Sequence, residues 1–78
     1  MKTINVKKPM IFELSARYDA RKSFYGKAHV LDYGNGELEL MSYETIVSRC
    51  HNGKVEHLGT WSMTTSRHQR EFEKQFAR

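Results

Sequence analysis

The chain has 78 residues, of which 38% are hydrophobic and 28% charged, so it can form one small domain and is too short for a multidomain enzyme. Its longest apolar runs fall far short of the roughly 20 residues of a membrane-spanning helix. A single cysteine, Cys50, excludes an internal disulfide. The first ten residues, MKTINVKKPM, lack the apolar segment and cleavage site of a secretory signal. Composition therefore favours one cytoplasmic domain over residues 1–78.

Positive charge is concentrated in the first third of the chain. The net charge is +4, from 13 Lys and Arg against 9 Asp and Glu. Residues 1–27 contain seven basic and two acidic side chains, whereas residues 28–78 contain six basic and seven acidic ones. Such asymmetry is typical of a protein with an acidic partner, either a nucleic-acid backbone or an acidic groove of a protein. The alternative interpretation is that the charge only keeps a small protein soluble.

The first part of the chain is predicted to contain a loose segment, a strand and a loop. Residues 1–10 are expected to form a flexible arm or an edge strand, because Pro9 has no N–H to donate to a neighbouring strand. Alternation of apolar and polar residues over 11–17 predicts a strand. One side of this strand carries Phe12, Leu14 and Ala16. The polar residues 18–25 are expected to form a loop that ends at Gly26.

Two hairpins are predicted in the middle of the chain. The first covers residues 28–40 and reverses at Gly34-Asn35-Gly36, since these residues tolerate positive φ. Residues 41–47 break the two-residue period, which indicates a bulge or corner near Ser42. The second hairpin turns at Asn52-Gly53, a dipeptide that favours a type I′ turn. This turn pairs His51 with Lys54, Cys50 with Val55, Ser48 with His57, Val47 with Leu58, and Arg49 with Glu56 as a cross-strand ion pair.

One helix is predicted at the C-terminal end. It is expected over residues 67–78, with Thr64, Thr65 or Ser66 as the capping residue. The packing stripe consists of His68, Phe72 and Phe76, and the solvent face of Arg67, Arg70, Glu71, Glu73 and Lys74. The sequence therefore predicts an α+β domain, in which an antiparallel sheet of four to five strands is packed against one C-terminal helix.

Cofactor and catalytic motifs are weak in this sequence. The second hairpin places Cys50 and His57 on one face as diagonal neighbours, a weak candidate pair for zinc. A half-buried cysteine and a solvated histidine explain the same residues. The same pair with Glu39 or Glu44 is the one arrangement that suggests a nucleophile and a base. Because the sequence has no nucleophile elbow or phosphate loop, it predicts a protein that is not an enzyme and has no cofactor.

Basic and aromatic residues alternate in the segment before the first hairpin. Candidate partner-binding residues are Arg21, Lys22, Tyr25 and Lys27, together with Arg67 and Arg70 near the start of the helix. Interleaved cations and aromatic rings suit a small module that binds RNA or single-stranded DNA. Nine aromatic residues are more than so small a core can bury, and this excess favours a surface that binds a protein. Both partner classes stay open, as does the choice between monomer and dimer.

Three blocks of sequence are distinctive as a set: RKSFYGKA at 21–28, SYETIV at 42–47, and TTSRH at 64–68 followed by Glu71, Phe72 and Gln75. In this order they resemble a small uncharacterised family of domains encoded by phages and mobile elements of Gram-positive gut bacteria. The resemblance covers residues 15–77 and implies a short accessory protein of the kind that acts against host defences.

The family context of the resemblance implies an anti-CRISPR protein. Such a protein would bind a Cas effector such as Cas9, or its guide complex, in the cytoplasm of the bacterial host and block DNA recognition or cleavage. A net charge of +4 disfavours an inhibitor that mimics DNA, so direct docking on the effector is expected.

Overall fold

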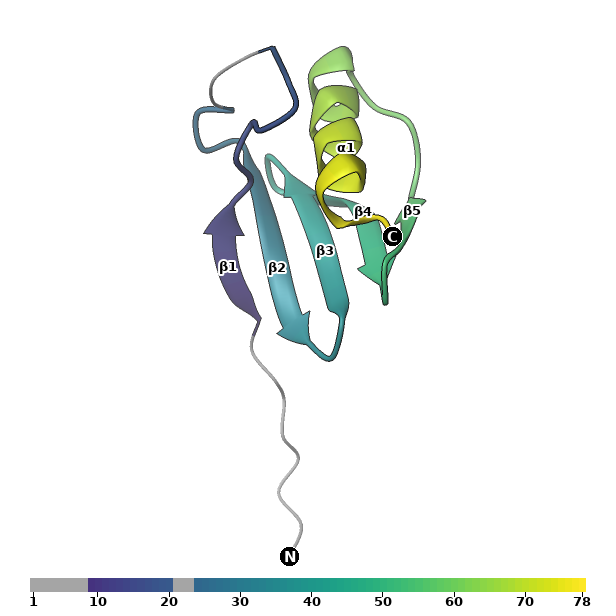
Figure 1. Ribbon diagram of the computed structural model, residues 1–78. Helices are drawn as coiled ribbons and strands as arrows, with labels where there is room; N and C mark the ends of the chain where they lie inside the picture. The colour runs from purple at the N-terminus through teal and green to yellow at the C-terminus, as the bar shows by residue number, and fades with distance from the viewer. Residues whose placement is uncertain (1–8, 21–23) are drawn as a thin grey trace, which may run out of the picture.

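The computed structural model describes residues 9–20 and 24–78, which form five strands and one helix (Figure 1). Each strand is antiparallel to the next, so the sheet has the order β1-β2-β3-β4-β5. The elements are β1 (Met10–Glu13), β2 (Ala28–Gly34), β3 (Glu37–Ser42), β4 (Thr45–His51), β5 (Lys54–His57) and α1 (Met63–Phe76). This arrangement confirms the predicted α+β fold with a C-terminal helix packed on the sheet.

Both hairpins form where the glycine and asparagine residues predict them. Asn35 joins β2 to β3 with φ 56°, and Asn52 joins β4 to β5 with φ 51°. The four pairs between β4 and β5 are His51 with Lys54, Cys50 with Val55, Arg49 with Glu56 and Ser48 with His57, as predicted. The prediction that Arg49 forms an ion pair with Glu56 is wrong. Arg49 Nε instead lies 3.5 Å from Glu39 Oε2 on β3. An inner strand offers two cross-strand neighbours, and here the carboxylate on β3 makes the contact.

The irregularity predicted near Ser42 consists of a turn and a bulge. Tyr43 and Glu44 connect β3 to β4. The register then shifts, because Leu40 pairs with Ser48 whereas Met41 pairs with Ile46. Val47 is thus the extra residue of β4. The bulge lets the consecutive residues Val47 and Ser48 both be buried, with 1% and 0% exposure, which explains why this stretch lacks a two-residue period.

Helix α1 begins four residues earlier than predicted. Ser62 is the N-cap in an extended conformation, and its Oγ accepts the N–H of Thr65 at 3.2 Å. Thr64, Thr65 and Ser66, the expected capping residues, therefore lie inside the first turn of the helix. Ser62 precedes them and already accepts a backbone N–H of that turn with its side chain. The helix ends at Phe76, short of the predicted end at Arg78. Within the described part of the chain, no helix is long and apolar enough to cross a membrane.

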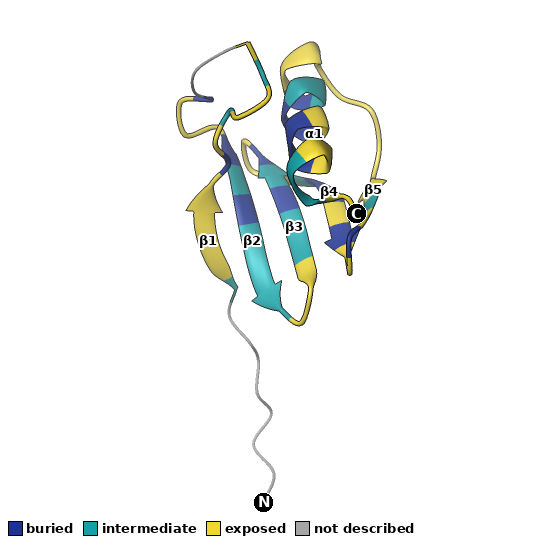
Figure 2. Ribbon diagram, viewed as in Figure 1, coloured by how far each residue is buried: buried dark blue, intermediate teal, exposed yellow. Residues whose placement is uncertain are grey.

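The helix covers only part of the sheet. It lies against β3, β4 and β5, and part of its length is buried (Figures 1 and 2). Phe72 on this helix is fully buried. Strand β1 is exposed along its whole length, and Phe12 is 41% exposed. The buried hydrophobic cluster consists of Leu14, Phe24, Ala28, Val30, Leu40, Val47, Cys50 and Phe72. Leu14 and Phe24 come from the segment between β1 and β2. These side chains add to the core at the part of the sheet that the helix does not contact.

A buried carboxylate attaches this loop to the helix. Glu71 is 2% exposed, and it accepts the backbone N–H of Tyr18 at 2.9 and 3.0 Å and that of Arg17 at 3.1 Å. The side-chain amide of Gln75 donates both to Glu71 and to the carbonyl of Ser15, at 2.5 and 2.7 Å. The prediction of Glu71 on the solvent face is therefore wrong. Helical periodicity could not show that a loop distant in sequence covers that side of α1.

Glu71→Gln should destabilise the fold strongly. The substitution places an amide NH₂ against at least the N–H of Tyr18, so a buried acceptor is lost and the donors of Arg17, Tyr18 and Gln75 compete for the remaining oxygen. We expect the free energy of unfolding to fall by about 1.5–3 kcal/mol in urea titrations followed by circular dichroism. Glu73→Gln, on the same helix but with a side chain 55% exposed, is the matched control and should cost less than about 1 kcal/mol. Equal losses for the two variants would contradict this role.

Candidate binding site at the start of the helix

The structure brings several of the predicted binding residues together at the start of α1. Tyr25, Lys27 and Arg67 line one cavity of about 90 Å³. Its remaining walls come from Phe24, Tyr43, Thr64 and His68. Arg70 lines a neighbouring cavity that shares Arg67 with the first. Arg21 and Lys22, the other two predicted contacts, lie outside the described residues.

Two tyrosines of the cavity have a left-handed backbone conformation. The φ angle is 55° at Tyr25 and 59° at Tyr43. Among the described residues other than glycine, only Asn35 and Asn52 share this property, and asparagine tolerates it well. Tyr25 is 77% exposed and Tyr43 46% exposed, so burial of the ring does not compensate for the backbone cost. Strained residues of this kind concentrate at functional sites.

Hydrogen bonds from backbone N–H groups fix the two segments that carry these tyrosines. The N–H of Tyr43 donates to the carbonyl of Lys27 at 2.7 Å, which ties the β3–β4 turn to the loop before β2. The N–H of Gly26 donates to a carboxylate oxygen of Glu13 on β1 at 2.6 Å, fixing the residue after Tyr25. Lys27 Nζ lies 5.9 Å from the centre of the Tyr43 ring, within range of a cation–π interaction.

A buried histidine forms one wall of the cavity. His68 is 1% exposed, and its Nδ1 lies 2.8 Å from the hydroxyl of Ser42. Its ring meets Phe24 edge-on with 4.6 Å between centroids. Within the described residues its Nε2 has no hydrogen-bond partner. Burial lowers the pKa of His68, an effect that Lys27 reinforces and the carboxylate of Asp19 opposes.

A row of cations extends from this cavity along the exposed side of the helix. Arg67, Arg70 and Lys74 follow one another at helical spacing and line the neighbouring cavity of about 200 Å³. The loop side of that cavity includes Tyr18 and Asp19, and Asp19 Oδ1 lies 3.6 Å from the guanidinium of Arg67. We name this surface the tyrosine–arginine face. Its residues are Tyr18, Tyr25, Lys27, Tyr43, Arg67, Arg70 and Lys74.

Comparison with known proteins gives a family but no activity. Residues 12–78 match the model of DUF8033, described as a family of unknown function. The chain belongs to this family. No curated protein and no solved structure shows a significant match to the chain. The family match does not bear on the phage or anti-CRISPR context implied by the sequence resemblance.

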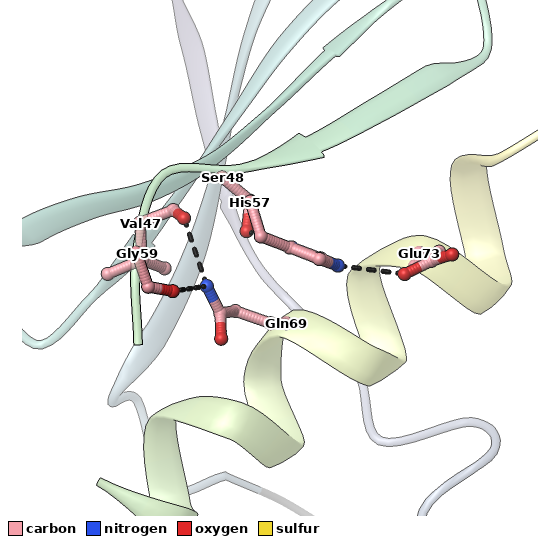
Figure 3. Close-up of polar contacts among 6 residues, drawn as sticks. All are labelled: Val47, Ser48, His57, Gly59, Gln69 and Glu73. Atoms are coloured by element: carbon pink, nitrogen blue, oxygen red, sulfur yellow. Dashed lines mark hydrogen bonds and ion pairs between the residues drawn. The ribbon is translucent and has the colours of Figure 1, made fainter. Parts of the chain in front are cut away.

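Figure 3 shows a second polar cluster in this domain, between β4, β5 and the helix. His57 Nδ1 lies 2.7 Å from the Ser48 hydroxyl, and its Nε2 lies 2.7 Å from a carboxylate oxygen of Glu73. The order serine, histidine, carboxylate is that of a nucleophilic triad. Ser48, however, is 0% exposed, so its hydroxyl cannot reach a substrate in this structure. Gln69 donates to the carbonyls of Val47 and Gly59 beside it, so the cluster fastens the helix to the sheet.

The predicted zinc pair is engaged in other contacts. The thiol of Cys50 is buried and donates to the carbonyl of Phe76 at 3.8 Å, and both ring nitrogens of His57 have protein partners. Over residues 9–20 and 24–78, no three histidine, cysteine, aspartate or glutamate side chains gather as a metal site. The prediction of no cofactor, with zinc at Cys50 and His57 as its weak alternative, stays a prediction that elemental analysis would test.

Several residues of this region were not predicted as contacts, among them His68, Tyr18, Tyr43 and Lys74. The helical stripe predicts His68 only as a packing residue, and it is indeed buried. Tyr18 and Tyr43 fall in a polar loop and in an aperiodic stretch, where alternation carries no information about direction. The break in the two-residue period at 41–47 was the signal that the sequence offered for Tyr43. It indicates a corner in the chain but does not show which side chain lies at that corner.

Substitutions at Tyr43 should reverse the usual order of alanine and glycine. Tyr43→Gly and Tyr43→Ala both remove the ring, but only glycine relieves the left-handed backbone, so it should be more stable by about 1 kcal/mol. Urea unfolding measures the difference. The same two substitutions at Glu44, whose φ is not positive, should favour alanine or show no preference. An alanine variant at Tyr43 as stable as the glycine variant would show that the backbone there is unstrained.

The lowered pKa of His68 predicts a pH-dependent stability. At pH values below the usual histidine pKa of 6.5, His68 takes up a proton in the unfolded chain more readily than in the folded chain. The free energy of unfolding should therefore fall as the pH drops from about 7 to about 5, and level off below the folded-state pKa. Urea titrations across this range, with His68→Phe expected to have the flatter profile, measure the effect. A ring that titrates in NMR above its usual value would contradict it.

Proposed function

We propose that the protein is a non-catalytic binding domain that covers a surface of another macromolecule with its tyrosine–arginine face. The observation that carries this proposal is the pair of exposed tyrosines, Tyr25 and Tyr43, held in a costly left-handed conformation around one cavity. The fold gains little from exposed rings on strained backbone, whereas a partner surface would gain a rigid aromatic contact. Arginine beside tyrosine is also the composition of energetically dominant interface contacts.

The sequence resemblance supports a specific partner. Its three blocks, at 21–28, 42–47 and 64–75, are distant in sequence, yet each contributes to the same cavity, with Tyr25, Tyr43 and Arg67 as examples. The pattern that links this chain to phage-encoded domains therefore coincides with the candidate site. On this basis the proposed partner is a Cas effector such as Cas9 with its guide, bound in the bacterial cytoplasm so that DNA recognition or cleavage is blocked.

Single-stranded RNA or DNA is the second candidate partner, and one observation favours it. Arg67, Arg70 and Lys74 form a row of cations beside Tyr18, so phosphates and stacked bases could be contacted together. The acidic residues Glu37, Glu39 and Glu56 line a different cavity and do not interrupt this row.

Capture and cleavage assays test the proposal. Cas9 with its guide should co-purify with the protein, and DNA cleavage should fall when the protein is added. Tyr25→Ala and Arg67→Ala should each weaken binding by at least about tenfold, a loss typical of dominant interface residues. Arg49→Ala, which removes the same charge from the ion pair with Glu39 outside the face, is the matched control and should bind normally.

Salt dependence separates the two partners. Binding to single-stranded nucleic acid should weaken steeply between about 50 and about 200 mM salt, whereas a protein interface with an apolar core should change little. Undiminished cleavage together with no capture would end the effector proposal. If neither partner binds, or if Tyr25→Ala and Arg67→Ala bind as well as the wild type, the tyrosine–arginine face is not the binding surface.

A further inference from the structure

We infer that strand β1 is a self-association site, at which a second copy of this chain pairs edge to edge so that two five-stranded sheets join across a two-fold axis. The surface consists of the four residues of β1, which are Met10, Ile11, Phe12 and Glu13. None of them belongs to the tyrosine–arginine face. A dimer of this kind would therefore leave that face free and present it twice.

Strand β1 exposes apolar side chains on both faces of the sheet. Met10 is 72% exposed, Ile11 56% and Phe12 41%. Phe12 lies opposite Val30 of the buried cluster, whereas Ile11 lies opposite Leu31 on the other face of the sheet. The whole strand is exposed, since the helix lies against β3, β4 and β5 (Figure 2). Consecutive exposed apolar residues on a strand indicate a surface that another molecule covers.

The outer edge of β1 has backbone groups available for pairing. The N–H of Leu14 donates to the carbonyl of Ala28 on β2 at 2.9 Å. In an antiparallel strand both backbone groups of one residue point to the same side, and the side alternates along the chain. Those of Phe12 therefore face β2, whereas those of Ile11 and Glu13 face outward. Among the described residues, β2 is the only strand that pairs with β1.

The opposite edge of the sheet is protected by charge, and this contrast favours β1 of a second copy as the occupant. On β5, Lys54, Glu56 and His57 are exposed, and charged residues of this kind discourage pairing at an edge. Pairing of β1 with β5 of another copy would set apolar residues against these charges and would leave further edges open. Pairing of β1 with β1 is closed after two copies.

A two-fold axis at Ile11 matches the side chains of the two strands. In this register Ile11 lies opposite Ile11 of the second copy, and Met10 lies opposite Phe12, so that apolar residues meet on both faces. Glu13 lies opposite Pro9, which brings no like charges together. The outward N–H groups of Ile11 and Glu13 would donate to the carbonyls of Ile11 and Pro9 of the second copy. Proline has no N–H, so this register leaves no outward donor of these residues unpaired.

The size of the surface predicts a weak dimer. At roughly 150–250 Å² for a large side chain, the exposed fractions of Met10, Ile11 and Phe12 provide roughly 250–400 Å² on each copy. Stable interfaces bury about 600–1,000 Å² per partner, so this one belongs to the weak, reversible class. Backbone hydrogen bonds between the two edges add to the apolar contact. We therefore expect monomers at low micromolar concentration and dimers toward about 1 mM.

Sedimentation equilibrium of the full chain tests the inference. Between about 10 µM and about 1 mM, the average mass should rise from one chain toward two. Met10→Lys and Ile11→Lys should each weaken the dimer at least about tenfold, because they bring like charges together at the axis. Met63→Lys is the matched control. It makes the same change at a methionine 81% exposed on the helix and should leave the dimer unchanged.

Amide hydrogen exchange locates the contact. Exchange of the Ile11 and Glu13 N–H groups should slow as the protein concentration rises. The N–H of Val55 faces the open edge of β5, because the alternate residue Leu58 donates to the Val47 carbonyl, and its exchange should not change.

Several results would overturn the inference. A mass of one chain at every concentration excludes self-association, and growth beyond two copies would indicate pairing of β1 with β5. An equal loss of dimer in Met63→Lys would place the contact elsewhere. Slow exchange of the Ile11 N–H at every concentration would show that the chain covers this edge itself. Because the tyrosine–arginine face is not involved, each of these results leaves the proposed function standing, and failure to capture a macromolecule leaves the dimer standing.

Discussion

The carboxylate of Glu71 joins the helix to the loop that completes the core. Helix α1 lies against β3, β4 and β5, so the inner face near β2 needs cover from elsewhere. The loop provides it with Leu14 and Phe24, and the N–H groups of Arg17 and Tyr18 bind Glu71. A domain of this size buries only a small hydrophobic core. The hydrogen bonds of Glu71 therefore contribute a large share of the stability of the folded domain.

The candidate site lies where three segments that are distant in sequence meet. The loop before β2 contributes Tyr25, the β3–β4 turn contributes Tyr43, and the first turns of the helix contribute Arg67 and His68. Each segment is held in place by backbone or buried side-chain hydrogen bonds, such as that between Tyr43 N–H and the Lys27 carbonyl. A rigid junction of this kind can present exposed aromatic rings in a fixed arrangement, which lowers the entropy cost of binding a partner.

Polar groups between helix and sheet fall into two kinds. On the β4–β5 side, His57 and Gln69 have all of the partners described above, and they anchor the helix without any free donor (Figure 3). On the loop side, His68 lines a cavity with cationic walls, and within the described residues only its Nδ1 has a hydrogen-bond partner. The two histidines therefore differ in whether the described part of the protein supplies a second hydrogen bond to the ring.

The sequence by itself determined the elements whose signals are local. Glycine and asparagine turns gave both central hairpins and the β4–β5 register, and the spacing of His68 and Phe72 gave the buried face of the helix. Only the tertiary structure decided which polar residues became buried or gathered. Glu71 looked solvent-facing because its partners lie more than 50 residues away, and Tyr43 joined Tyr25 and Arg67 because a bulge and a loop brought them together. Periodicity reports a residue's position on its own element, whereas a site made from three elements depends on how they pack.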